Sequence, residues 1–518
     1  MEVIDNRGIL LQVREPDRVT NAIRQSKYIE QLNPESHRVL VNWTLDNTRR
    51  LANLGMRKTP SPILRDYDWP GAFKPYDHQK ETASFLTANN RAFCFSEQGT
   101  GKTGAVIWAA DYLMKVGDVK RVLIVCPLSI MHSAWMNDIF SIAMHRTAAV
   151  AHGSRDIRKQ VILGDYEFVM INYDGVPTVV DELQQGGFDL VVADEANFVK
   201  TATTRRWKAL NKVVTPETKL WMLTGTPAAQ SPLDAFGLAK MLCPQRVPRY
   251  YGSWRDKVMV KITQFKWVPT TNATKLVNAA LQPAIRFTKA ECLDLPPVTY
   301  QTREVELTDQ QKKYYKALKK QMYVEAAGEQ ISAVHAAAGL NKLLQLSCGA
   351  VYSDDGETVQ FDAKNRLDEI VEVVKEAAHK VIVFVPFRHA IEIVTDRLLK
   401  DGFSAEIISG AVSMNARTRI FKEFQEKSDP RVLVIQPQSA AHGVTLTAAD
   451  TIVWFGPIAS VETWLQANER INRPSQKNKM TVIKIYGSEV EKRVYKALES
   501  KEANQKDLVA LYEQELSS

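Results

Sequence analysis

The sequence predicts an α/β protein with two successive units, each built on a parallel sheet whose two faces are covered by helices. Short apolar runs alternate with longer amphipathic stretches over residues 71–242, and the same alternation returns over 298–518. Such alternation is typical of buried parallel strands separated by helices. The 518 residues allow about three domain-sized units of ~150 residues each. A third, smaller unit is therefore expected beside the two large ones.

Residues 1–70 are predicted to form this small N-terminal accessory domain. Apolar stretches at Ile9–Leu11 and Val39–Val41 indicate strands, and Leu45–Leu54 indicates a helix. The proline-containing segment Thr59–Pro62 is typical of a linker. The domain has a basic share that suits phosphate contact, and packing against the edge of the next sheet is the alternative. The basic residues are Arg14, Arg18, Arg24, Lys27, Arg38, Arg49, Arg50, Arg57 and Lys58.

The two large units are predicted from their apolar runs. In the first unit the runs are 91–95, 122–125, 168–171, 190–193 and 220–223, and in the second they are 381–385, 405–408, 432–435, 451–455 and 482–485. Thr308 and Gln311 have the spacing of a capping box that opens a helical insertion near 308–347. Asp355–Gly356 is typical of a hairpin turn.

The connector between the units, residues 243–297, is rich in Pro, Arg and aromatic residues and is expected to be irregular. It contains a basic and aromatic cluster that could grip nucleic acid or pack between elements. The cluster comprises Arg246, Arg249, Tyr250, Tyr251, Trp254 and Arg255.

Composition narrows the function class. The formal net charge of +8 favours a polyanionic partner, although many basic soluble proteins carry a similar charge. The five cysteines are scattered, which predicts neither a zinc site nor a disulfide framework and indicates a reducing compartment. No apolar run is long enough to span a bilayer. A monomer in the cytoplasm, or in the nucleus if the host has one, is expected, with no membrane partner.

A phosphate-binding loop is the strongest motif. Residues 96–103 read SEQGTGKT and follow the first predicted strand directly. Backbone N–H groups in such a loop cradle phosphates, Lys102 would reach the β- and γ-phosphates, and the Thr103 hydroxyl would ligate Mg²⁺. A loop of chance composition is the alternative, and the strand before it and the helical pattern after it argue against that. The predicted ATP-binding loop residues are Glu97, Gly99, Thr100, Gly101, Lys102 and Thr103.

An acidic pair follows the strand 190–193. Asp194 would hold the magnesium, and Glu195 would orient and deprotonate the attacking water. Two acids after a strand could also be the solvated start of a loop. The phosphate loop and the acidic pair each follow a predicted strand, and the loop comes first in the chain, as in other nucleotide-binding units. This order favours the catalytic interpretation.

Two arginines of the second unit are candidates for catalysis. Phosphoryl transfer needs positive charge in the transition state, and an arginine finger often supplies it. Arg470 and Arg473 are three residues apart, so in a helix they share one face. A solvated basic face is the alternative for this segment.

Taken in order, these segments resemble the superfamily 2 helicases and, within them, the Swi/Snf-related DNA translocases, over about 72–500. The resemblance implies two tandem RecA-like lobes and an ATP-dependent motor that tracks duplex DNA. Compact viral or bacterial members and the annealing-helicase branch are the nearest in layout. The matching segments are 73–79, 125–129 with Trp135, 171–173, 223–227, 383–387, 443–450 and 466–476.

The resemblance also implies residue roles. Gln79 would read adenine, Gly443 would contact the nucleotide, and Arg470 and Arg473 would be the fingers. Ser129, Asn172 and Tyr173 would contact DNA. Coupling between nucleotide and DNA would use Asn197, Thr224, Thr226 and Gln466. Departures from the family pattern are Ser96, Asn197, His442 and Pro474.

A basic stretch after the acidic pair extends the predicted nucleic-acid path. Arg205, Arg206 and Lys208 could contact phosphates and release counterions, and a solvated helix face explains them equally well.

The sequence therefore predicts an ATP- and Mg²⁺-dependent translocase or helicase on double-stranded or branched DNA, acting in replication, recombination or repair. An RNA helicase of the same superfamily and a DNA-binding scaffold with weak ATPase activity are the rivals. Nothing in the sequence names a protein partner.

Overall fold

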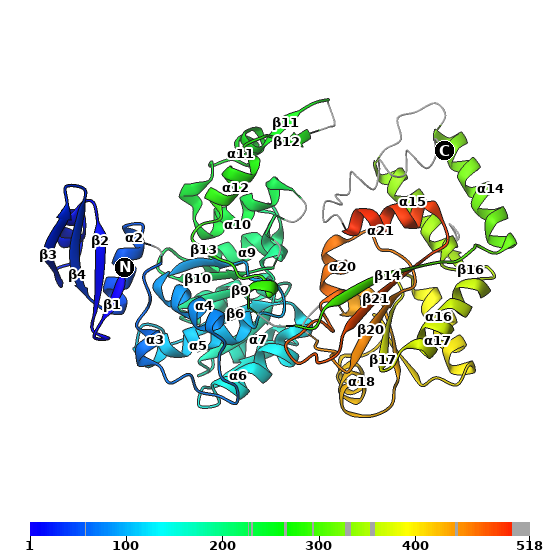
Figure 1. Ribbon diagram of the computed structural model, residues 1–518, viewed down its shortest axis with the longest axis horizontal. Coiled ribbons are helices and arrows are strands. Elements are labelled where there is room, and N and C mark those ends of the chain that lie inside the picture. The colour runs from blue at the N-terminus through cyan, green and yellow to red at the C-terminus, as the bar shows by residue number, and fades with distance from the viewer. Residues whose placement is uncertain are drawn as a thin grey trace. The chain divides into compact units, whose positions relative to one another are not determined.

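The computed structural model describes residues 1–56, 58–225, 227–228, 231–263, 267–292, 295–326, 333–352, 358–440 and 444–499. The chain divides into two compact units, Met1–Cys292 and Leu293–Ser518. Each unit holds a parallel sheet flanked by helices (Figure 1). The α/β fold with two tandem RecA-like lobes is thereby confirmed.

The first unit begins with a four-stranded antiparallel sheet of order β1-β2-β4-β3. Alternate residues of β2 and β4, including Ile9, Leu11, Val39 and Val41, form its small core together with Trp43. The two predicted strands and the predicted helix are confirmed, and β1, β3 and α1 were not predicted. The elements are β1 (Glu2–Ile4), β2 (Gly8–Val13), α1 (Pro16–Ala22), β3 (Ser26–Asn33), β4 (Ser36–Asn42) and α2 (Leu45–Asn53).

The segment that joins this sheet to the rest of the unit is buried, so the prediction of a free linker at Thr59–Pro62 is wrong. The Ser61 N–H donates to Ser84 Oγ at 2.8 Å, and Thr87 Oγ1 donates to Ser61 Oγ at 2.8 Å. The Trp43 indole donates to the Pro60 carbonyl at 2.8 Å. The backbone N–H and the hydroxyl of Ser61 thus both find partners on α4 (Asp77–Ala88), which the sequence pattern could not reveal.

The central sheet of the first unit has seven strands in the order β13-β5-β10-β9-β6-β8-β7, and every pairing is parallel. Both faces are apolar: along β9, Val191 and Ala193 belong to one hydrophobic cluster, and Leu190 and Val192 belong to another. The five predicted strands are confirmed, and the short β7 and β13 were not predicted. The strands are β5 (Arg91–Cys94), β6 (Val122–Cys126), β7 (Ala148–Val150), β8 (Phe168–Asn172), β9 (Leu190–Asp194), β10 (Lys219–Leu223) and β13 (Ala284–Ile285).

Helices cover the two faces of this sheet (Figure 1). Besides α4 they are α3 (Ile63–Asp66), α5 (Lys102–Lys115), α6 (Asn137–Ile142), α7 (Arg155–Leu163), α8 (Val180–Gln185), α9 (Arg205–Val213) and α10 (Ala235–Leu242).

The described residues of the predicted connector, 243–297, form helices and strands, so the expectation of an irregular segment is wrong. It contains α11 (Tyr251–Val258), the hairpin strands β11 (Met259–Lys261) and β12 (Trp267–Pro269), α12 (Ala273–Ala280), β13 and α13 (Lys289–Cys292). Trp254 is buried in the core of the first unit, whereas Tyr250 is 65% exposed. The basic and aromatic cluster is thus divided between packing and surface.

The second unit has a six-stranded parallel sheet of order β14-β21-β20-β17-β19-β18. The five predicted strands are confirmed. β14, whose residues are largely exposed at the sheet edge, was not predicted because it lacks an apolar pattern. The strands are β14 (Val298–Glu304), β17 (Lys380–Phe384), β18 (Ala405–Ile408), β19 (Val432–Ile435), β20 (Ala449–Trp454) and β21 (Met480–Tyr486).

The predicted capping box opens the helical insertion of the second unit. The Thr308 N–H donates to Gln311 Oε1 at 3.1 Å, and the Gln311 N–H donates to Thr308 Oγ1 at 3.4 Å. The predicted hairpin is present as β15 (Ala350–Tyr352) paired with β16 (Thr358–Gln360), and its Asp355–Gly356 turn lies outside the described residues. The helices are α14 (Asp309–Ala326), α15 (Ala333–Ser347), α16 (Lys364–Glu376), α17 (Arg388–Lys400), α18 (Met414–Glu426), α19 (Pro437–Ala440), α20 (Val461–Asn468) and α21 (Glu489–Glu499).

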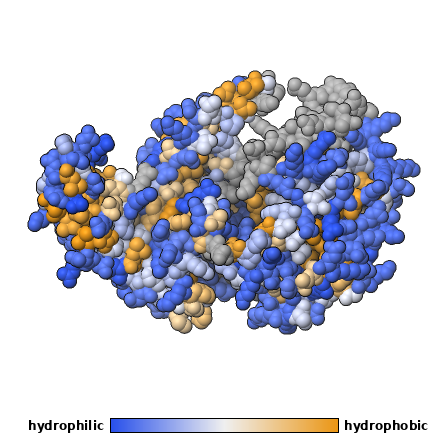
Figure 2. Space-filling view, viewed as in Figure 1, coloured by the Kyte–Doolittle hydropathy of each residue, from blue (hydrophilic) through white to orange (hydrophobic). Residues whose placement is uncertain are grey.

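The visible surface is mostly hydrophilic, with apolar patches on the N-terminal sheet and at the β11–β12 hairpin (Figure 2). Tyr28, Ile29 and Leu32 of the edge strand β3 are each more than 40% exposed. In the part of the chain that the structure describes, no helix has both the length and the apolarity to cross a bilayer.

Candidate nucleotide site and nucleic-acid path

The glycine-rich loop lies between β5 and α5, where the sequence predicted it. Gly99 and Gly101 have φ angles of +81° and +76°, a left-handed conformation that glycine adopts without strain. A Cβ on Gly101 would lie 1.9 Å from Gln79 Nε2, so no side chain fits there. The loop leads into the N-terminus of the 14-residue helix α5, whose free N–H groups favour an anion.

Lys102 lies folded over this loop. Its ammonium donates to the carbonyl of Ser96 at 2.7 Å and to that of Glu97 at 3.0 Å. The Thr100 hydroxyl also donates to the Glu97 carbonyl, at 2.8 Å. Thr103, in the first turn of α5, is half-buried. The loop thus holds a cation beside glycine N–H groups, which fits the triphosphate that the sequence predicted.

A distant segment anchors the loop from its other side. The Phe287 N–H donates to Ser96 Oγ at 3.1 Å, and the Lys289 N–H donates to Glu97 Oε2 at 3.0 Å. The serine in place of the family's first loop glycine therefore has a structural role here. The Glu97 side chain is an anchor, and its backbone is bonded as well: the N–H donates to the Phe287 carbonyl at 2.9 Å, and the carbonyl accepts from Lys102 and Thr100. The ATP contact predicted for Glu97 stays a prediction.

Gln79 contacts the loop directly. Its Oε1 accepts the Tyr76 N–H at 2.9 Å, which caps α4, and its Nε2 lies 3.4 Å from the carbonyls of both Thr100 and Gly101. The neighbouring His78 Nε2 bonds the Thr100 carbonyl at 2.8 Å, so this nitrogen carries the proton. The Gln79 amide, predicted to read adenine, therefore also steadies the phosphate loop.

The acidic pair lies at the carboxyl end of β9. Asp194 Oδ1 accepts the Glu195 N–H at 2.9 Å, and Asp194 Oδ2 accepts the Trp135 indole N–H at 2.9 Å. Burial raises the pKa of Asp194, while the nearby Lys102 ammonium, the indole and the Glu195 N–H act in the opposite direction. Glu195 has a φ of +51°, an uncommon conformation for a residue with a side chain.

The Asp194 carboxylate and the Thr103 hydroxyl are oxygen ligands of the kind Mg²⁺ prefers. In the described residues no group of three or more His, Cys, Asp or Glu side chains could hold a metal. Magnesium commonly takes only one or two protein ligands and completes its shell with phosphates and water. The donor set therefore fits a nucleotide-bound magnesium and does not fit an all-protein cage.

The predicted DNA contacts differ in their exposure to solvent. Ser129, Arg205 and Lys208 are exposed, and Asn172 is half-buried. Arg206 forms a two-pronged ion pair with Asp174, at 2.6 and 2.8 Å. These residues follow the carboxyl ends of β6 and β8 or lie on α9 in the first unit.

The predicted DNA contact by the Tyr173 side chain is wrong. The side chain is only 3% exposed, and its hydroxyl donates to the Asp194 carbonyl at 2.7 Å. Its side chain does not reach the surface and so does not present a DNA contact. The resemblance of residues 171–173 to a DNA-contacting motif of the family suggested the contact, whereas the hydroxyl of this buried ring makes an internal hydrogen bond.

The coupling residues of the first unit lie at the same end of the sheet. Thr224 follows β10, is 1% exposed, and donates its N–H to the Cys94 carbonyl at 3.1 Å. Asn197 lies in the 3-10 helix Ala196–Val199 that follows the acidic pair. Thr226 lies outside the described residues.

The two candidate arginines of the second unit do not share a helix face, because α20 ends at Asn468. Arg470 is 2% exposed, and its guanidinium donates to the Gln466 carbonyl at 2.7 Å and to the Val444 carbonyl at 3.1 Å. Arg473 is half-buried and donates to the Glu469 carbonyl at 3.1 Å. Arg470 thus braces two segments of the unit, and Arg473 is the more accessible of the pair.

Two other predicted residues of the second unit can be placed. Gln466 is 3% exposed, and its Nε2 donates to Glu462 Oε1 at 3.3 Å. Gly443, predicted to contact the nucleotide, lies outside the described residues.

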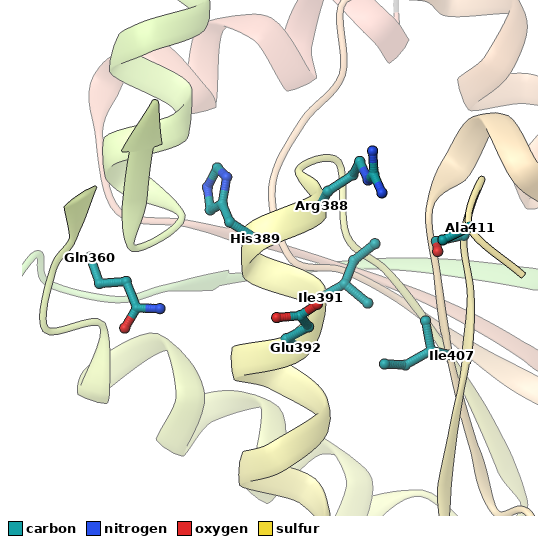
Figure 3. Close-up of a pocket in the computed structure, with 8 residues that line it drawn as sticks. Gln360, Arg388, His389, Ile391, Glu392, Ile407 and Ala411 are labelled. Atoms are coloured by element: carbon teal, nitrogen blue, oxygen red, sulfur yellow. The ribbon is translucent and has the colours of Figure 1, made fainter. Parts of the chain in front are cut away.

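A pocket that the sequence did not predict lies at the first turn of α17 (Figure 3). It has a volume of about 310 Å³ and combines the Arg388 guanidinium with the Glu392 carboxylate. Burial lowers the pKa of His389, which also lines it. Because both signs of charge line the pocket, charge alone does not select an anion.

Comparison with known proteins gives two domain matches. The SNF2-related domain matches residues 40–348, and the helicase conserved C-terminal domain matches residues 363–475. A putative protein p41 of Acyrthosiphon pisum secondary endosymbiont phage 1 is 27% identical over 78% of this chain and 90% of its own length. Chromodomain-helicase-DNA-binding protein 8 of Danio rerio is 26% identical over 83% of this chain. The chain spans 19% of the length of that relative.

Solved structures show a more distant likeness. The Sulfolobus solfataricus SWI2/SNF2 ATPase core in complex with dsDNA is 21% identical, with a TM-score of 0.43, over 86% of this chain and 96% of that one.

Proposed function

Since the chain belongs to the SNF2-related family and is an ATP hydrolase of the helicase class, we propose that it is a motor that moves along double-stranded DNA. The convergence of a phosphate loop and an acidic pair in the first unit carries this proposal. Lys102, Asp194 and Glu195 lie at the carboxyl ends of strands in one sheet, and the segments with Ser129 and Asn172 follow neighbouring strands of it.

In this proposal each residue has a defined task. The N–H groups around Gly99 and Gly101 cradle the phosphates, and Lys102 exchanges its loop carbonyls for phosphate oxygens. Magnesium, held by Thr103 and Asp194, supplies charge neutralisation at the phosphates. Glu195 orients the attacking water and accepts its proton. Arg473, with Arg470 behind it, supplies positive charge to the transition state.

The choice of DNA over RNA rests on the family and on its relatives. Several of the similar curated proteins are named as chromodomain-helicase-DNA-binding proteins. The exposed Ser129, Arg205 and Lys208 offer donors for phosphate contact, which carries no sequence information and suits a motor that moves along any sequence.

The decisive experiment measures ATP turnover against single-stranded DNA, duplex DNA, forked DNA and duplex RNA at several salt concentrations. We expect duplex DNA to stimulate turnover most, with stimulation falling steeply as salt rises. Lys102→Ala is the control and is expected to abolish turnover. Equal stimulation by duplex RNA would identify an RNA helicase, and DNA binding without any turnover would identify a scaffold.

The biological task that fits best is remodelling of DNA structures in replication, recombination or repair. Support comes from the phage relative, which this chain matches over 90% of that protein's length. Forked and four-way substrates in the same experiment test this choice: a motor for such structures is stimulated more by them than by linear duplex of equal length.

A further inference from the structure

Two buried aromatic side chains meet at Asp194. The Trp135 indole N–H donates to the carboxylate at 2.9 Å, and the Tyr173 hydroxyl donates to the backbone carbonyl of the same residue at 2.7 Å. Trp135 is fully buried and Tyr173 is 3% exposed. The structure therefore fixes both the side chain and the main chain of the residue proposed to hold magnesium.

The two aromatic residues come from segments whose outer parts reach the surface. Trp135 lies on the π-helix Met131–Met136, six residues beyond the exposed Ser129. Tyr173 directly follows Asn172, the last residue of β8. Because β6 is paired with both β8 and β9, the two segments leave the neighbouring strands β6 and β8, and Asp194 lies at the end of β9 on the other side of β6. Both are the segments for which the sequence predicted DNA contact.

A second line of contacts leads from Tyr173 toward the surface. Its ring stacks on Phe198, with centroids 5.1 Å apart and planes 9° from parallel. The Arg206 guanidinium lies over the other aromatic ring of this pair, 5.3 Å from the Phe198 centroid. Arg206, also a predicted DNA contact, thus reaches Asp194 through two stacked rings and one hydrogen bond.

We propose that Trp135 and Tyr173 are positioning residues that tie the DNA-contacting segments to Asp194. The inference rests on the proposed function and deepens it: a shift of either segment on DNA binding moves a donor bonded to the magnesium ligand. The carboxylate has one N–H donor on each oxygen, so its orientation follows the indole. A π-helix is an uncommon, wide turn that often marks functional sites, and here it carries the indole.

Conservative variants separate this role from simple packing. Trp135→Phe removes the N–H and keeps an aromatic ring, and Tyr173→Phe removes one oxygen atom. Trp221→Phe is a matched control, because Trp221 is also fully buried in this unit and its indole donates to the Asn89 carbonyl at 3.0 Å. Tyr67→Phe is the control for the hydroxyl, which bonds the buried Asp111 at 2.5 Å.

The first measurement is binding of the Mn²⁺ complex of a non-hydrolysable ATP analogue to the full-length protein, by calorimetry, with and without random-sequence duplex DNA. We expect Trp135→Phe to weaken this binding about tenfold, as for other partners of metal ligands. Tyr173→Phe should reduce the factor by which duplex changes the affinity, because the linkage between the two ligands passes through it. The second measurement is the ratio of ATP turnover with duplex to turnover without it, which should fall in both variants and in neither control.

Each result has a distinct meaning. If duplex stimulates the wild type and both variants match their controls in affinity and in stimulation ratio, this inference is overturned and the proposed function stands. If no nucleic acid changes either quantity in the wild type, the proposed function fails, and the link to DNA fails with it. Should Trp135→Phe not fold, Tyr173→Phe alone decides, since it leaves no cavity of a ring's size.

Discussion

Of the two acidic residues, Glu195 has the less common backbone conformation. Its φ of +51° costs on the order of 1–3 kcal/mol for a residue with a side chain, and such strain is usually retained where it serves a site. The conformation turns the chain sharply after β9, so that Asp194 remains at the strand end and Glu195 directly precedes the 3-10 helix Ala196–Val199. This backbone geometry is compatible with a glutamine at the same position.

We therefore predict that Glu195→Gln binds ATP and magnesium as the wild type does but hydrolyses ATP about 10²-fold more slowly or worse, because the base is lost. Single-turnover hydrolysis together with equilibrium nucleotide binding measures the two effects. If binding were lost as well, Glu195 would be structural and another residue would be the base.

Substitutions of Arg470 and Arg473 are predicted to differ in their effect on stability, although the two residues lie three positions apart in one motif. Arg473→Ala should keep its melting temperature and lose turnover by ~10³-fold, as for other arginine fingers. Arg470→Ala should lose turnover and also destabilise the second unit by about 2 kcal/mol, since its guanidinium bonds two buried backbone carbonyls. Thermal melting beside turnover distinguishes them. Equal melting temperatures would show that the bonds of Arg470 to Gln466 and Val444 contribute little to folding.

At the scale of elements, the sequence predicted the strands with continuous apolar runs and missed those without them. All ten predicted strands of the two large sheets are present: nine are interior strands whose burial on both faces gives a continuous apolar run, and the tenth, β18, is a partly buried edge strand. The edge strands β13 and β14 were missed, since one has only two residues and the other is mostly exposed. Hydrogen bonding to a neighbour forms such strands, and that neighbour lies far away in the sequence.

The residues of the candidate site also fall into a predicted and an unpredicted group. The phosphate loop, the acidic pair and the arginines were predicted because the residues that define each motif lie within a few positions of one another in the sequence. The bonds from Trp135, Tyr173 and Phe287 were not, since each joins segments 21 to 191 residues apart. The helix face assigned to Arg470 and Arg473 was wrong because α20 ends at Asn468, and no capping residue in the sequence marked that end.

A buried ion pair joins two helices of the second unit and gives a prediction about stability. The Arg366 side chain on α16 is 3% exposed, and the Glu491 side chain on α21 is fully buried. Two hydrogen bonds of 2.8 and 2.7 Å join them. Glu491→Gln leaves the guanidinium without its counter-charge, which should destabilise the unit by about 3–5 kcal/mol. Glu489→Gln, at an exposed position on α21, is the control. Hydrogen exchange in α16 and α21 measures the effect locally, and equal protection in the two variants would contradict it.

At the scale of the whole molecule, the N-terminal sheet is fastened to the first lobe. Arg49 forms a two-pronged ion pair with Asp118, at 3.0 and 2.7 Å, and donates to the Thr87 carbonyl at 3.1 Å. Other arginines of this domain pair with acids of the same domain, among them Arg38 with Glu30 and Arg50 with Asp46. The free positive charge available for phosphate contact is accordingly smaller than the sequence suggested.

Two truncated chains test what the N-terminal domain does. A chain that begins at Thr59 keeps Ile63 and Tyr67, which are buried in the core of the first lobe, and should fold and retain ATPase activity. A chain that begins at Trp69 lacks them and should be insoluble. Turnover on forked against linear duplex then tests selection: the Thr59 chain loses its preference for forks if the domain selects branched DNA. An unchanged preference would leave the domain a packing role alone.

The order in which the sheet is assembled has a consequence for synthesis on the ribosome. Among the described strands β5, which carries the phosphate loop, pairs with β10 and β13, and the loop is anchored by Phe287, 191 residues downstream of Ser96. During translation this strand therefore has no partner in its sheet until β10, at residues Lys219–Leu223, has emerged, and its loop lacks the anchor until Phe287 has emerged. A nascent chain arrested before residue 219, where β10 begins, should present an unpaired apolar strand to chaperones. Nucleotide binding would then begin only after the segment with Phe287 has been added.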